Sequence, residues 1–257
     1  MTDHKYQYTM ASYAGVYTDV ILSLQRALAH LSASVPPPQQ TRIATGNAYR
    51  YREKLPQQAI VLKCTRALSA LIAIKSLLDE GLALDAGALM RVSDEVGSDI
   101  LFLAGPLIFR HEPENSHSRY LDEFFQEEFD TPDPINSSQK RDRVSRRQVR
   151  AYVARTFSST ADVNQAVEVT RTIETTFSGY VHGAGAHTMD VYDGRSFHIH
   201  LQEGDKPLVD LINQYSQYLQ RTVMHFAIAS KALGAEGLFN QLYALNRHHF
   251  DDYGELR

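Results

Sequence analysis

Apolar residues recur at the three-to-four-residue spacing of an α-helix along most of the chain. A sustained alternation of apolar and polar residues, typical of strands, is found only in the histidine-rich segment near 183–204. The pattern therefore predicts an all-α protein, a multi-helix bundle in which residues 183–204 form a loop or short hairpin insertion. The sequence shows no fixed-period repeat and no low-complexity linker, so we expect a single domain over residues 1–257.

The predicted helices cover 12–34, 56–80, 83–103, 118–129, 138–157, 161–177, 205–232 and 238–250. Three prolines at 36–38 end the first helix, and Pro56 suits the first turn of the second. The second helix is apolar on nearly every side between 67 and 74, so we expect it to be the central, most buried one. Gly81 makes the second and third helices antiparallel neighbours, and Asp205 is expected to cap the helix that follows it.

Composition and charge indicate a protein with a large core, no disulfide and no membrane span. A hydrophobic content of 43% is enough for a large core, and a single cysteine, Cys64, excludes an internal disulfide. The N-terminus is polar, and the longest uncharged apolar runs fall far below the ~20 residues that cross a membrane. We therefore expect a cytoplasmic protein with no membrane partner. The net charge of −4 gives no overall attraction for nucleic acid, so such binding would need a local basic patch.

Arg91 and Glu95 lie four positions apart on a predicted helix, with Asp94 and Asp99 close by. Such a pair is either a solvated surface salt bridge or a partly buried anchor in a polar pocket.

Ser178 and His182 have the same spacing, and a hydroxyl beside an imidazole is a candidate nucleophile and base. Alternatively, His182 and Gly183 end the helix, with the glycine in the left-handed conformation. We predict that Arg91 and Glu95 face a polar pocket that contains His182.

A basic segment forms a further candidate site, for a phosphate-bearing ligand. It contains Lys140, Arg141, Arg143, Arg146, Arg147, Arg150 and Arg155. On one continuous helix, Lys140, Arg143, Arg147 and Arg150 would share a face and present a row of phosphate contacts. The acidic residues between 112 and 133 offer the alternative that the two segments simply pair, within the chain or across a dimer.

The segment 182–200 holds His182, His187, His198 and His200. On an extended chain His198 and His200 point to one side, and with Glu203 or Asp190 they could bind a divalent metal. The many glycines of the segment would make an ordered site costly, and no cysteine or histidine pair on a rigid helix supports one. We therefore predict no bound metal and no cofactor.

Two resemblances follow from these motifs. Residues 60–103, with Arg91-x-x-x-Glu95, and the later Ser178-x-x-x-His182-Gly183 resemble a group of all-helical bacterial proteins classed only as a domain of unknown function. That resemblance implies the fold and no activity. Arg110-His111 with His117, and Arg195-Ser196 with His200, are similar to the motif of HEPN-type helical ribonucleases. This second resemblance implies metal-independent RNA cleavage, with Arg110 stabilising phosphate charge and His117 moving a proton.

The leading hypothesis is accordingly a homodimeric helical bundle that acts on, or senses, RNA or another phosphate-bearing ligand. One alternative is a noncatalytic interaction or regulatory protein whose charged helices bind a partner. Another is a metal-dependent hydrolase that uses the histidine cluster at 182–200.

Overall fold

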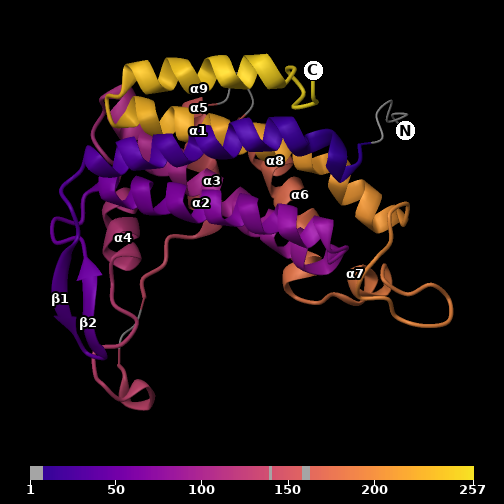
Figure 1. The fold of residues 1–257 in the computed structure, drawn as a ribbon. Coiled ribbons are helices and arrows are strands. Elements are labelled where there is room, and N and C mark those ends of the chain that lie inside the picture. Colours follow the sequence, from indigo (N-terminus) through magenta and orange to yellow (C-terminus); the bar gives the residue numbers. More distant parts are fainter. Residues whose placement is uncertain (1–7, 139–140, 158–162) are drawn as a thin grey trace.

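The computed structural model describes residues 8–138, 141–157 and 163–257, and within 163–174 only some of the side chains. It confirms the all-α class, because helices make up the body of the molecule and the described residues add only one two-stranded sheet (Figure 1). The elements are α1 (Ala14–Ala33), β1 (Gln39–Ile43), β2 (Gly46–Arg50), α2 (Pro56–Asp79), α3 (Ala83–Phe109), α4 (Asn115–Phe124), α5 (Arg146–Phe157), α6 (Val163–Val181), α7 (Gly185–Met189), α8 (Lys206–Ala232) and α9 (Glu236–His249).

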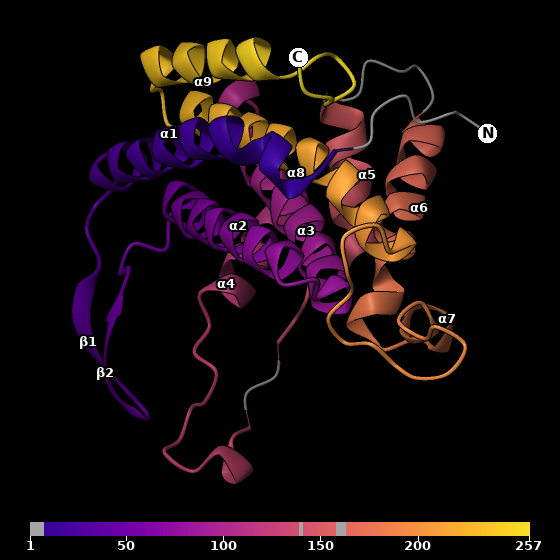
Figure 2. The same cartoon turned by 45° about the vertical axis from the view of Figure 1, so that its right-hand side comes forward.

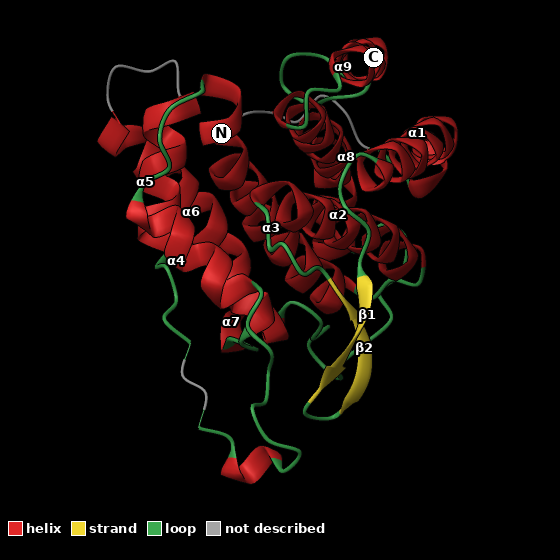
Figure 3. Cartoon of the chain, turned by 90° about the vertical axis from the view of Figure 1, so that its left-hand side faces the viewer, coloured by secondary structure: helices red, strands yellow, loops and turns green. Residues whose placement is uncertain are grey.

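Helix α3 lies between the helix pair α2 and α8 and the helix pair α5 and α6. It contacts α2 and α8 on one side and α5 and α6 on the other, as the turned views show (Figures 2 and 3). We expected α2 to be the central helix, but α2 shares the centre with α3. Three glycines let aromatic rings approach the α3 backbone closely: Tyr180 packs on Gly87, His225 on Gly97 and Tyr152 on Gly105.

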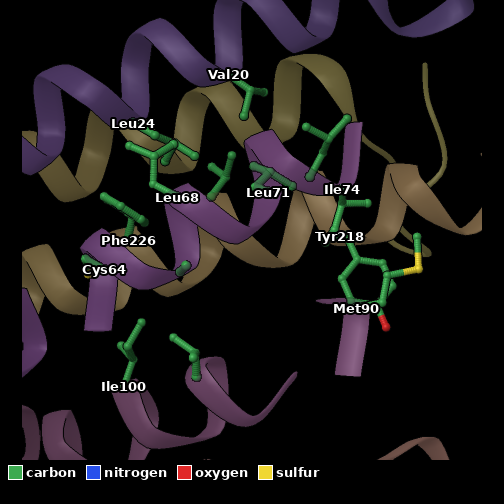
Figure 4. Packing of buried hydrophobic residues seen from close by; sticks show 14 of the residues in the cluster. Val20, Leu24, Cys64, Leu68, Leu71, Ile74, Met90, Ile100, Tyr218 and Phe226 are labelled. Atoms are coloured by element: carbon green, nitrogen blue, oxygen red, sulfur yellow. The ribbon is translucent and has the colours of Figure 1, made fainter. Parts of the chain in front are cut away.

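The core is built mainly from α1, α2, α3 and α8. Helices α1 and α8 bury one apolar face each, whereas α3 is buried on every side between Phe102 and Pro106. Figure 4 shows part of it, including Val20, Leu24, Cys64, Leu68, Leu71, Ile74, Met90, Ile100, Tyr218 and Phe226. Cys64 is a buried free thiol, in line with a packing role. No helix among the described parts of the chain is long and apolar enough to cross a membrane.

Helix α3 continues past the predicted end at 103, through Pro106 to Phe109. A proline inside a helix has no N–H to donate to the carbonyl four residues earlier, which here is that of Phe102. His117 takes that place, because its Nε2 lies 3.1 Å from the Phe102 oxygen. A residue from the next helix therefore allows α3 to pass through the proline.

The sequence pattern missed the antiparallel hairpin of β1 and β2, in which Ile43 pairs with Gly46 across a two-residue turn. The insertion at 183–204 contains the short helix α7 and one isolated bridge between Tyr192 and Phe197. Its end is fixed to the α2–α3 turn, where Leu201 N donates to Gly81 O at 3.0 Å.

Candidate functional site

Asp99 on α3 is buried and lies between two cations. Lys63 Nζ is 2.7 Å from its Oδ2, and Arg146 Nη1 is 2.5 Å from its Oδ1. Burial, together with the charge of Asp99, raises the pKa of the nearby Tyr120 hydroxyl. A carboxylate removed from water needs such partners, since an unpaired buried charge is strongly destabilising. The cluster ties α2, α3 and α5 together.

Asp94, one and a half turns earlier, is held in a similar way by α8. It accepts a hydrogen bond from the Tyr218 hydroxyl at 3.0 Å and one from Arg221 Nη1 at 2.9 Å. The Arg221 guanidinium also lies 4.2 Å from the centre of the Tyr218 ring. Both carboxylates therefore serve as anchors between helices.

The predicted pair Arg91 and Glu95 forms, with Arg91 Nη2 2.6 Å from Glu95 Oε1. The Arg91 side chain is only 13% exposed, whereas that of Glu95 is 40% exposed. The pair lies on the side of α3 next to α6, since Gly87, one turn before Arg91, packs on Tyr180.

Ser178 and His182 lie at the end of α6. Helix α6 stops at Val181, Gly183 has φ 60°, and Ala184 N donates to Gly179 O at 2.8 Å. This is the pattern of a helix ended by a left-handed glycine. The His182 side chain is exposed beyond the helix, so a pocket shared by His182 and Arg91 stays a prediction.

Arg110 and His117 lie in different surroundings. Arg110 is exposed and ends α3 in the left-handed conformation, with φ 53°. The His117 ring is buried and stacks on Phe102 with 4.0 Å between ring centres. Burial lowers the pKa of His117. A ring enclosed by Phe102 and Tyr152 is out of reach of a ligand on the surface where Arg110 stands.

The basic segment is not one helix from 138, as predicted, because α5 begins at Arg146. Ser145 and Gln148 form a reciprocal cap: Gln148 N donates to Ser145 Oγ at 3.3 Å, and Ser145 N to Gln148 Oε1 at 3.1 Å. Arg143 therefore precedes the helix and shares no helical face with Arg147 and Arg150. Lys140 lies outside the described residues.

Most of the described cations of this segment lie beside carboxylates. Arg141 and Arg143 each approach Glu123 to 3.7 Å, and Arg155 Nη2 is 2.9 Å from Glu114 Oε1. These contacts match the alternative in which the basic and acidic segments pair.

The three arginines predicted to bind a ligand differ in exposure. Arg143 and Arg147 are exposed, whereas Arg150 is half-buried with its Nε enclosed. A ligand on α5 could therefore reach Arg147 more easily than Arg150.

Asp193, Ser196 and His198 meet in the histidine-rich segment. His198 Nε2 lies 2.8 Å from Asp193 Oδ2 and 3.1 Å from Ser196 Oγ. The backbone N–H groups of Ser196 and Arg195, and then His198, lower the pKa of Asp193 to about 2. A serine-protease relay needs the serine and the aspartate on opposite ring nitrogens, and here both contact one nitrogen.

The other histidines of this segment also bond to the protein. His187 Nε2 lies 3.1 Å from Thr176 O, and His200 Nδ1 lies 2.8 Å from Glu80 O. Over the described residues, histidine, cysteine, aspartate and glutamate side chains form no group of three that could hold a metal. The geometry therefore adds no support to the metal-dependent hydrolase.

A surface that the sequence pattern missed lies on the β1–β2 hairpin, which projects away from the helices (Figures 1 and 3). In its register Gln40 stands opposite Tyr49, and Arg42 stands opposite Asn47. Directly paired residues, and residues two apart on a strand, point to the same side. These four side chains therefore share one side of the hairpin, and all four are exposed. We call it the hairpin face.

The opposite side of the hairpin is partly covered, since Thr41, Ile43 and Ala48 are half-buried. Arg50 fixes the hairpin to the segment after α4, with Nε 2.5 Å and Nη2 2.9 Å from the two Glu127 oxygens. A cavity of about 530 Å³ lies between the two segments. Its walls include Tyr49, which also belongs to the hairpin face, together with Tyr51, Phe124, Phe125 and Arg141. Aromatic rings and cations thus gather at this end of the molecule.

The chain matches no family model, and no curated protein or solved structure shows significant similarity to it. The resemblances to the all-helical bacterial domain and to HEPN ribonucleases therefore stay predictions, and a function has to be argued from the geometry itself.

Proposed function

We propose that the protein binds single-stranded RNA through the hairpin face. The observation that carries the proposal is the register of the hairpin, which sets an exposed tyrosine, an arginine and two side-chain amides side by side. The proposal concerns binding without cleavage, because the buried His117 lacks the access that a HEPN-like reaction needs.

The tyrosine and the arginine match the two general features of single strands. Tyr49 is 70% exposed, so an unpaired base can stack on its ring. Arg42 lies diagonally across the hairpin from Tyr49, where its guanidinium can contact a phosphate next to the stacked base.

The amides of Gln40 and Asn47 add hydrogen-bonding groups on the same side. A side-chain amide both donates and accepts, so it can bond to a base edge or to a 2′-hydroxyl. DNA has no 2′-hydroxyl and so cannot form this hydrogen bond, which favours RNA as the ligand.

The local charge favours the hairpin over α5. Arg42, Arg52 and Lys54 are exposed on the hairpin and just after it. Glu53, beside Arg52, is the one acidic residue of segment 39–54, and Glu127 interacts with Lys54. The α5 segment has more cations, but Glu123, Glu114 and Asp99 neutralise most of those described there. Phosphates attract unneutralised cations most strongly, even on a chain of net charge −4.

Fluorescence anisotropy with a labelled uridine oligomer of about 12 nucleotides tests the proposal. Tyr49→Ala should weaken binding by about tenfold, the loss expected for one stacked base. Arg42→Gln should weaken it and lower the log–log salt slope by at most about 0.7, the value for one phosphate contact on a single strand. Tyr253→Ala, at a tyrosine that is 84% exposed elsewhere, is the matched control and should have no effect.

Two results would overturn the proposal. One is the absence of saturable binding at low salt. The other is binding that survives Tyr49→Ala but is lost when Arg143, Arg147 and Arg150 are all changed to glutamine, which would move the interface to the basic segment. Intact recovery of the RNA after incubation separates binding from HEPN-like cleavage.

A further inference from the structure

A second cavity, of about 340 Å³, lies far from the hairpin, between α8, α9 and the C-terminal segment 250–257. Three arginines from these three elements reach it: Arg221, Arg247 and Arg257. Leu101, Met224 and Ile228 form its apolar side. A volume of this size is at the lower end of the range for small-molecule sites.

The arginines keep donors available for a ligand. Arg257 uses Nε to bond Phe250 O at 2.7 Å, which holds the C-terminal segment against the cavity. Arg221 uses Nη1 for Asp94 and Nε for Gln217 O at 3.3 Å. A guanidinium has five N–H groups, so these bonds use only part of its capacity.

Two carboxylates also line the cavity, Asp251 and Asp252. Asp251 is engaged in the turn of the C-terminal segment, since its Oδ1 accepts from Tyr253 N at 2.8 Å and from Glu255 N at 2.9 Å. Asp94 already pairs with Arg221, and the two lining carboxylates stand beside Arg247 and Arg257. The arginines therefore offer a phosphate directed N–H groups rather than a net positive charge.

Asn246 supplies an observation that itself points to a ligand. Its Oδ1 is enclosed and has no hydrogen-bond partner among the described residues. An enclosed, unsatisfied carbonyl oxygen is destabilising, so it favours a molecule that brings an N–H or O–H. The neighbouring His225 ring packs on the backbone of Gly97, and burial, followed by the charge of Arg221, lowers the pKa of His225 to about 4.

We propose that this cavity binds a small molecule that combines a phosphate group, an apolar or aromatic ring and a hydrogen-bond donor, as nucleoside monophosphates do. The arginines would hold the phosphate, the apolar side would take the ring, and Asn246 Oδ1 would accept from the donor. The site stands apart from the hairpin face, so either proposal can fail without the other.

Isothermal titration calorimetry with adenosine monophosphate tests it. We expect saturable 1:1 binding that Arg247→Gln weakens by at least about tenfold, the loss typical of one charged hydrogen bond. Asn246→Leu should also weaken binding, whereas the free protein keeps or gains stability because the enclosed oxygen is gone. Arg195→Gln, in the 183–204 segment, and Tyr49→Ala, on the hairpin, should leave binding unchanged.

Three results would overturn this inference. The first is no saturable heat at millimolar nucleotide. The second is binding that Arg247→Gln and Asn246→Leu leave unchanged or that Tyr49→Ala abolishes, because the nucleotide would then lie elsewhere. The third is binding of inorganic phosphate as tightly as of the nucleotide, which would remove the role of the apolar side.

Discussion

At the scale of single residues, His117 replaces a hydrogen bond that α3 cannot make for itself. Pro106 has no N–H, and the Phe102 carbonyl that would have accepted it lies in the core. The His117 Nε2 serves that carbonyl instead. The histidine that resembles a catalytic one is thus explained by a structural need.

This role predicts a coupled effect of two substitutions. His117→Phe keeps an aromatic ring but leaves the Phe102 oxygen unsatisfied, so the free energy of unfolding should fall by about 1–3 kcal/mol. Pro106→Ala restores a backbone N–H that can bond to the Phe102 oxygen. In that background His117→Phe should therefore lower the free energy of unfolding by clearly less. Urea unfolding of the four proteins measures the coupling. Equal costs in both backgrounds would show that His117 does not stand in for the missing donor.

A second prediction at this scale concerns acid. Burial lowers the pKa values of His117, His225 and His249, that of His225 to about 4. The folded state therefore binds these protons more weakly than the unfolded state, in which a histidine titrates near pH 6.5. The stability they contribute is complete above about pH 6.5 and is lost as the pH falls toward the folded-state values.

We expect the free energy of unfolding to decrease from about pH 7 to about pH 5, with His225 responsible for up to roughly 3 kcal/mol over its full range. His225→Gln should flatten the dependence, whereas His182→Gln, at an exposed histidine, should not. Urea unfolding at several pH values checks this. A profile that is flat in the natural protein would contradict it.

Local spacing predicted only part of the candidate sites. The i, i+4 relation of Arg91 and Glu95 was enough to predict their ion pair. The partners of Asp94 and Asp99 could not be predicted, because Arg221 and Lys63 come from other helices and no local pattern links them. For the same reason the sequence could not show that His117 packs on Phe102.

At the scale of elements, the long amphipathic helices were predictable and the hairpin was not. Helices α1, α2, α8 and α9 begin and end close to their predicted limits, because each has apolar residues at helical spacing and a proline or glycine boundary. The hairpin is exposed on one side and only half-buried on the other, so it has little apolar alternation. The remaining sign of a hairpin in the sequence was Gly46, which follows the two-residue turn and has φ 141° in the structure.

The sequence did indicate the start of α5, through the capping pattern Ser145-x-x-Gln148. This cap begins the helix at Arg146, although the spacing of residues before it also fits a helix. Ser145→Ala should lower the free energy of unfolding by about 0.5–2 kcal/mol, because it removes the acceptor for Gln148 N. Thermal and urea unfolding measure the loss. Ser32→Ala, at an exposed serine within α1, is the control and should change little. Equal effects of both substitutions would argue against the cap.

At the scale of the whole molecule, the hairpin projects from one end of the helical body, where a long flexible ligand has access (Figure 1). The cavity near α9 lies at a different place and suits a small ligand. Both proposed sites rely on local cations rather than on the overall charge, which is −4. The homodimer stays a prediction that sedimentation would test.

The most direct test of RNA binding at the hairpin face is photo-crosslinking of an oligomer containing 4-thiouridine, with the attached peptides identified by mass spectrometry. We predict that crosslinks fall within residues 39–54, with Tyr49 as the main site, and that their yield drops sharply in Tyr49→Ala. Crosslinks confined to α5, or an equal yield in Tyr49→Ala, would contradict the assignment of the hairpin face as the RNA-binding surface.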